Sequence, residues 1–126
     1  MIDYLGMVKN FHKAFHLPIG NQPQLLNNQE QFANRLRLII EELSEYCEAV
    51  AKKDVVDMAD GLADLLWVVF GTAVEHGLPM NQIFKEVAAS NMSKVDGYKD
   101  SSGKWIKPDT YKPVDLSWLL ESEETK

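Results

Sequence analysis

The chain of 126 residues has little of several things that define other classes of protein. Its single cysteine, Cys47, excludes an internal disulfide and suits a reducing, cytoplasmic setting. The formal net charge of −6 argues against broad binding to nucleic acid or to an anionic membrane. The N-terminus has no basic flank and no long apolar run, so neither a signal peptide nor a membrane anchor is expected. The longest apolar run, 62–74, is interrupted by Asp64 and is too short to cross a bilayer.

Apolar residues recur at helical spacing from the N-terminus to about residue 93, and no strand is expected before residue 95. Asp54 is placed to cap a helix, Gly77 to end it and Pro79 to start the next one. We therefore expect an all-α fold with a long connection over about 17–29. The helices are predicted at about 3–16, 28–52, 54–76 and 79–93.

The C-terminal part has a different composition, dense in lysine, aromatic and turn residues. About 96–113 is expected to be an irregular, flap-like segment, followed by a short helix over 115–121. The last residues, 122–126, are expected to be a frayed tail. The length predicts that residues 1–126 form a single domain.

Two acidic clusters lie in stretches that otherwise have the composition of buried helix. Glu42 and Glu45 are three residues apart and share a helix face, and so do Asp57, Asp60 and Asp64. The neighbours of Asp64 are apolar, which disfavours a solvated acidic face there. Carboxylate oxygens are the ligands that Mg²⁺ and Mn²⁺ prefer, so the pattern predicts a divalent cation between two helices.

Histidine-based metal sites are disfavoured. A di-iron carboxylate bundle expects Glu-x-x-His on two helices, and none of the three histidines follows a glutamate at that spacing. His12 and His16 are four residues apart but lack a third ligand nearby, so we interpret them as packing or surface residues.

Two lysine-containing segments each allow two interpretations. Lys94 closes the fourth helix, where a cation suits the negative end of the helix dipole. Alternatively, Asn91 and Lys94 face the metal site, and the lysine holds a phosphate. The segment from Lys104 to Lys107 is either a solvated loop or a flap over an anionic ligand that carries a base.

The order of motifs resembles the all-α nucleoside triphosphate pyrophosphohydrolases. E-E-x-x-E is followed by a second acidic helix, then N-x-S-K, then G-K-x-x-K-P-x-x-Y-x-P. The group includes MazG-like proteins, dimeric dUTPases and phosphoribosyl-ATP pyrophosphohydrolases, and the resemblance runs from about Phe11 to Leu116. The resemblance implies a MazG-like bundle of four to five helices, completed by dimerisation into a homodimer or homotetramer. It also implies Mg²⁺-dependent cleavage of the α–β phosphate bond of a nucleoside triphosphate, which gives a monophosphate and pyrophosphate.

The resemblance also assigns metal ligands. Glu42 and Glu45 match the first pair of ligands, and Asp64 matches the aspartate of the E-x-x-D element. Gly61 stands where that element has its glutamate. We choose Asp60 as the substitute, because a spacing of four keeps it on the face of Asp64; Asp57 is the alternative.

The expected mechanism follows from these assignments. Mg²⁺, or Mn²⁺, is held by Glu42, Glu45, Asp60 and Asp64, and Glu41 or Glu45 accepts a proton from the attacking water. The substrate is expected to be dUTP or another noncanonical nucleotide. Phosphoribosyl-ATP hydrolysis and a non-catalytic, metal-binding helical regulator are the alternatives. Substrate contacts are expected from Asn91, Lys94, Lys104, Lys107 and Tyr111, with Trp105 as a second candidate for stacking on the base.

Overall fold

The computed structural model describes residues 1–121, so the tail expected at 122–126 lies outside the described residues. Two compact units divide at residue 78: an N-terminal unit, 1–78, and a C-terminal unit that begins at Pro79. Most of the regular structure is helical, and the fold is all-α, as the sequence predicted. Within the described range, no helix is both long and apolar enough to cross a membrane.

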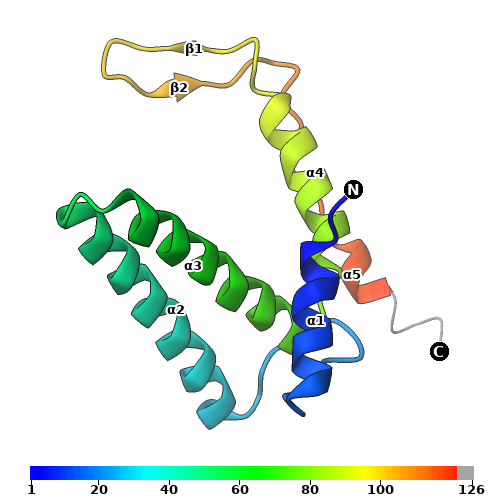
Figure 1. The fold of residues 1–126 in the computed structure, drawn as a ribbon. Coiled ribbons are helices and arrows are strands. Elements are labelled where there is room, and N and C mark those ends of the chain that lie inside the picture. Colours follow the sequence, from blue (N-terminus) through cyan, green and yellow to red (C-terminus); the bar gives the residue numbers. More distant parts are fainter. Residues whose placement is uncertain (122–126) are drawn as a thin grey trace. The chain divides into compact units, whose positions relative to one another are not determined.

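The N-terminal unit consists of three helices, α1 (Tyr4–Ala14), α2 (Gln29–Ala51) and α3 (Val55–Glu75). Helices α2 and α3 form an antiparallel hairpin, and α1 packs against α3 (Figure 1). The sequence predicted all three to within about two residues, because their apolar periodicity is strong.

Side chains of the sequence fix where these helices begin. The Asn28 carboxamide accepts from the backbone N–H groups of residues 30 and 31, at 2.9 and 3.2 Å, at the start of α2. The Asp54 carboxylate accepts from the N–H of Asp57 at 3.0 Å, which confirms its predicted role as the cap of α3. Gly77 follows α3 with φ of 69°, a left-handed conformation that favours glycine.

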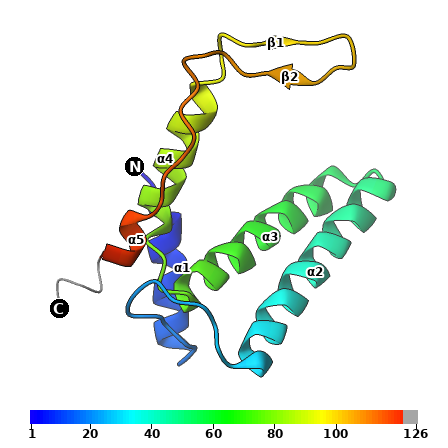
Figure 2. The same ribbon diagram turned by 180° about the vertical axis from the view of Figure 1, so that it is seen from behind.

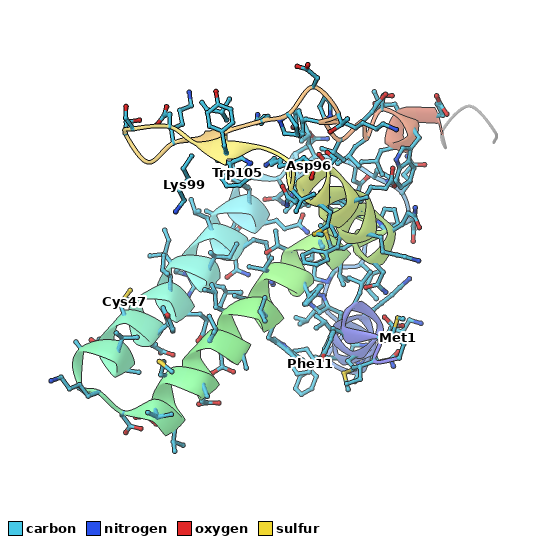
Figure 3. The ribbon with its side chains drawn as sticks, turned by 90° about the horizontal axis from the view of Figure 1, so that it is seen from above. Met1, Phe11, Cys47, Asp96, Lys99 and Trp105 are labelled. Atoms are coloured by element: carbon cyan, nitrogen blue, oxygen red, sulfur yellow. The ribbon has the colours of Figure 1, made fainter. Side chains whose placement is uncertain are left out.

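Aromatic rings join α1 to α3. Phe11 projects from α1 (Figure 3), and its ring meets the Trp67 ring edge-on with centroids 5.3 Å apart. Val8, Ala73 and Val74 are buried. His12 is also buried, and its Nδ1 donates to the carbonyl of Pro18 at 2.9 Å, so this histidine is a packing residue as expected.

The C-terminal unit contains α4 (Met80–Met92), a two-stranded antiparallel hairpin and the short α5 (Trp118–Glu121). The strands, β1 (Tyr98–Lys99) and β2 (Trp105–Ile106), form a narrow ribbon after α4 (Figure 2). The Asp100 carboxylate closes the turn by accepting from the N–H groups of residues 102 and 104. The sequence did not predict these strands, and α5 begins three residues later than expected.

Candidate functional site

Three carboxylates converge between α2 and α3. Glu42 and Glu45 lie one helical turn apart on α2, and Asp64 meets them from α3. One oxygen from each side chain lies within 4.8 Å of the other two. We call these three residues the carboxylate cluster. The hairpin thus brings together three of the four metal ligands that the sequence predicted.

Burial and mutual repulsion make the charged cluster costly. Burial, followed by a hydrogen bond that protonated Glu42 donates to Glu45 and by the negative charges of Glu45, Asp64 and Glu41, raises the pKa of Glu42. Burial, followed by the charges of Asp60 and Glu45, raises the pKa of Asp64. Among residues 1–121, no hydrogen-bond donor reaches the buried Oε2 of Glu42. Protonation or a bound cation would each relieve this cost.

The donor set fits a hard divalent cation. All of the converging ligand atoms are carboxylate oxygens, and one of the three carboxylates, that of Glu42, has an oxygen without a hydrogen-bond partner among the described residues. Mg²⁺ and Mn²⁺ prefer such oxygens to nitrogen or sulfur. The cluster therefore has the chemistry and the uncompensated negative charge that a divalent cation requires.

Asp60 and Asp57 lie beside the cluster rather than within it. Both line a cleft of about 220 Å³ together with Glu45 and Asp64. Neither belongs to the group of carboxylates whose oxygens lie within 4.8 Å of one another. The negative charge of Asp60 nevertheless helps to raise the pKa of Asp64. The two aspartates thus supply further carboxylate oxygens to the cleft.

Close helix packing accounts for Gly61, which stands where the E-x-x-D element has its glutamate. Gly61 is buried against α2, and a Cβ at this position would lie 3.2 Å from the Cα of Tyr46. A glutamate at position 61 would press its side chain against the α2 backbone. Positions 57 and 60 both line the cleft, so a carboxylate can reach it from either of them.

The two proposed proton acceptors have different surroundings. Glu41 is exposed, and its carboxylate forms an ion pair with Arg37 at 3.0 Å. Glu45 lies in the carboxylate cluster and lines the cleft. Glu45 is therefore the one of the two that lies where a cation and its water would bind.

Four of the five expected substrate contacts lie near one another within the C-terminal unit. The Lys94 ammonium donates to the Asn91 carboxamide at 3.0 Å and lies 5.7 Å from the Tyr111 ring centroid. Lys107 lies 4.6 Å from the same centroid. The backbone of Lys104 belongs to the Asp100 turn instead. This arrangement concentrates two ammonium groups beside one aromatic ring.

Trp105 has a structural contact in the same unit. Its indole N–H donates to the backbone carbonyl of Lys94 at 2.9 Å, so the hairpin is joined to the end of α4 (Figure 3). The Tyr111 ring is engaged as well, by the ammonium groups of Lys94 and Lys107.

Sequence reasoning missed a buried ion pair between α2 and α3. Arg35 on α2 and Glu75 on α3 are 5 % and 4 % exposed, and the guanidinium contacts the carboxylate at 2.9 Å. Arg35 also donates to Thr72 and to the carbonyl of Val68. Gly71 leaves room for the guanidinium, because a Cβ there would clash with it. The available signal was Glu75 itself, a lone acidic residue at the end of an apolar helix.

Comparison with known proteins gives one family. The family model described as Phosphoribosyl-ATP pyrophosphohydrolase matches residues 8–91, about two thirds of the chain. The matched range contains the whole N-terminal unit from Val8 onward and continues to Asn91 at the end of α4. No curated protein matches the chain.

Proposed function

The chain belongs to the phosphoribosyl-ATP pyrophosphohydrolase family, within the MazG-like superfamily, and we propose that it hydrolyses nucleoside triphosphates with Mg²⁺. Membership makes the chain a pyrophosphohydrolase, a hydrolase that acts on phosphoric anhydrides. The carboxylate cluster, with its orphaned Glu42 oxygen, is the observation that carries the proposal. The products would be a nucleoside monophosphate and pyrophosphate.

Different residues of the N-terminal unit would bind the cation and accept the proton. Glu42, Glu45 and Asp64 would hold the cation, with Asp60, or Asp57, as a further ligand. When bound, a divalent cation neutralises phosphate oxygens and lowers the pKa of water. Glu45 would accept the proton of the water that attacks a phosphorus of the α–β anhydride. The bridging P–O bond breaks, and pyrophosphate leaves.

The C-terminal unit would supply positive charge. Lys94 and Lys107 lie together beside Tyr111 and would meet the triphosphate, while Asn91 contacts sugar or phosphate. Lys104 would add charge from the hairpin. We propose that both units act as one catalytic domain in the cytoplasm, without nucleic-acid or membrane partners.

A second copy of the chain would cover an apolar face of the α2–α3 hairpin. Arg35, which faces α3, is followed by exposed Leu36, and Gly61, which faces α2, is followed by exposed Leu62. In an antiparallel pair of helices, the residue that follows an inward-facing residue lies on the same side of the pair in both helices. Leu36 and Leu62 therefore lie on one side of the hairpin. We propose a homodimer or homotetramer that buries this face. The exposed residues are Leu36, Ile40, Leu43, Leu62, Leu66 and Val69.

Pyrophosphate release over a nucleotide panel tests the proposal. The panel contains the common ribo- and deoxyribonucleotides, dUTP, damaged nucleotides and phosphoribosyl-ATP, each with Mg²⁺ and with EDTA. The last of these is the second candidate substrate, favoured by the family match. Glu45→Gln should abolish release while keeping the fold. Glu121→Gln, which removes the same charge from α5, is the matched control. Equal rates for both variants would refute the assignment.

A further inference from the structure

The N-terminal unit has a second cavity, separate from the acidic cleft. It measures about 700 Å³ and runs along the N-terminal half of α2. Gln31, Asn34 and Leu38 of α2 form one wall, and Leu17 and Pro18, which follow α1, line it as well. This volume lies within the range of about 300–1,000 Å³ that is typical of small-molecule sites. We call this cavity the amide groove.

The amide groove lies on the same side of α2 as the carboxylate cluster. Leu38 and Asn34 come four and eight residues before Glu42, so successive turns of one helix face carry all three. A rise of about 1.5 Å per residue separates Asn34 from Glu42 by about 12 Å along the axis. A nucleotide with its phosphates at the cluster and its sugar and base directed toward the N-terminus of α2 would reach the amide groove.

Buried charges fix the orientation of the Gln31 amide. Its Nε2 donates to Oε1 of Glu75 at 2.9 Å, and the other Glu75 oxygen is held by Arg35 at 2.9 Å. Glu75 is 4 % exposed, so its position is set by the surrounding helices. The amide nitrogen is therefore engaged, and the Oε1 of Gln31 keeps its capacity to accept a hydrogen bond.

The Asn34 amide is oriented the opposite way. Its Oδ1 accepts from the Arg37 guanidinium at 2.5 Å, and Arg37 in turn pairs with Glu41. The Nδ2 group of Asn34 thus keeps its capacity to donate. Gln31 and Asn34 are three residues apart, which places an acceptor and a donor on one side of the helix.

The remaining walls suit a group without negative charge, because the exposed Glu30 lines the groove as well. Arg35 and Arg37 line the groove, but each is already paired with a carboxylate. Leu17, Pro18 and Leu38 add apolar surface. The Leu17–Pro18 wall is anchored, because the N–H of Leu17 donates to the carbonyl of His12 and the His12 ring donates to the carbonyl of Pro18. Phosphates would find no unpaired guanidinium here.

We propose that the amide groove binds the nucleobase of the substrate, with Gln31 Oε1 and Asn34 Nδ2 recognising adjacent donor and acceptor atoms on the edge of the base. The inference rests on the proposed function, because it assigns the base end of the same substrate. It predicts that the substrate is a nucleotide with an intact base. A triphosphate that lacks a base should be hydrolysed less efficiently than the nucleotide.

Two isolated changes test the recognition pair. Asn34→Asp replaces the donor by an acceptor of the same shape, and Gln31→Met keeps the length but removes the acceptor together with the amide that donates to Glu75. Asn27→Asp makes the same chemical change as the first variant at an exposed position before α2 and is the matched control. Melting temperatures of all three variants check that the fold is intact.

The first measurement is kinetic. For the nucleotide that the wild type hydrolyses fastest, kcat/KM should fall at least tenfold in Asn34→Asp and Gln31→Met, and stay unchanged in Asn27→Asp. Inorganic tripolyphosphate, which has no base, should be hydrolysed equally by all of them. Equal effects on both substrates, or no effect on either, would overturn the inference.

The second measurement is independent of catalysis. Deoxyuridine, deoxycytidine, deoxyadenosine and deoxyguanosine are titrated without metal, and the side-chain amide resonances of Gln31 and Asn34 are followed by NMR. At least one nucleoside should shift both resonances in the wild type, and the shift of the remaining Gln31 resonance should be lost in Asn34→Asp. If pyrophosphate release fails while these shifts persist, the proposed function fails and the groove assignment stands. If no nucleoside shifts them, the groove assignment fails, whatever the activity.

Discussion

Replacing Arg35 by methionine should strongly destabilise the N-terminal unit. Arg35 is 5 % exposed and contacts the Glu75 carboxylate at 2.9 Å. It also bonds to Thr72 and to the carbonyl of Val68, so one side chain joins α2 to three positions of α3. Methionine is flexible enough to fill the space, but among the described residues it leaves the buried Glu75 carboxylate with only the Gln31 amide at 2.9 Å and the His12 ring at 3.9 Å.

The expected loss can be estimated from comparable buried pairs. Removing one partner of a buried ion pair costs about 3–5 kcal/mol, because the other charge stays uncompensated. For a chain of this length, 1 kcal/mol corresponds to about 3–5 °C in melting temperature. Arg35→Met should therefore lower the melting temperature by roughly 10–20 °C.

Calorimetry and urea denaturation of the variant measure this loss, with Arg37→Met as the control. Arg37 and Glu41 form an ion pair of nearly the same length, 3.0 Å, but their side chains are 58 % and 51 % exposed. Solvent screening limits such a pair to under about 1 kcal/mol. The double variant Arg35→Met, Glu75→Leu should recover most of the loss, because no charge is then left buried.

Equal loss in Arg35→Met and Arg37→Met would refute this reasoning. A double variant that is less stable than Arg35→Met would refute it as well. Either result would mean that burial does not set the energy of the Arg35–Glu75 contact.

Three further predictions concern association, pH and the hairpin. Light scattering at micromolar concentration should show at least a dimer, and Ile40→Lys should shift it toward a monomer; a monomeric wild type would contradict the proposed apolar interface. In EDTA, burial and repulsion raise the pKa values of Glu42 and Asp64, so between their ordinary and raised values the folded state binds more protons than the unfolded chain. The free energy of unfolding should therefore rise as the pH falls through that window, and rise less in Asp64→Asn; an identical pH dependence of the two proteins would count against the effect. Lys107→Glu should weaken binding of a triphosphate more than of a monophosphate, and hydrogen exchange over 97–113 should slow when Mg²⁺ and a non-hydrolysable nucleotide are added; unchanged exchange would leave the segment a plain loop.

Local patterns predicted the helices well. Asp54 and Gly77 have the side chain and the backbone freedom that helix ends require, and they bound α3 as expected. The shared face of Glu42 and Glu45 also follows from spacing alone. By contrast, strands of two residues, β1 and β2, are too short to show alternation, so the hairpin left no pattern to detect.

Contacts between distant residues were beyond the reach of local patterns. Arg35 and Glu75 are 40 residues apart in sequence, and nothing in either helix alone predicts their pairing. The closeness of α2 and α3 at Gly61 is also a tertiary property, and it disfavours a larger side chain at position 61. Asp64 was predicted from its apolar neighbours, whereas the place of Asp60 at the edge of the cluster depends on the packing of the hairpin.

Binding of Mn²⁺, used as a spectroscopic substitute for Mg²⁺, tests the central claim most directly. The carboxylate cluster should bind the ion in the wild type, and Asp64→Asn should weaken this binding at least tenfold while raising the melting temperature of the metal-free protein, because one member of a repelling group is removed. Electron paramagnetic resonance gives the free Mn²⁺ concentration, and Glu121→Gln serves as the control for net charge. Equal Mn²⁺ affinity in the wild type and Asp64→Asn would contradict a metal site at Glu42, Glu45 and Asp64.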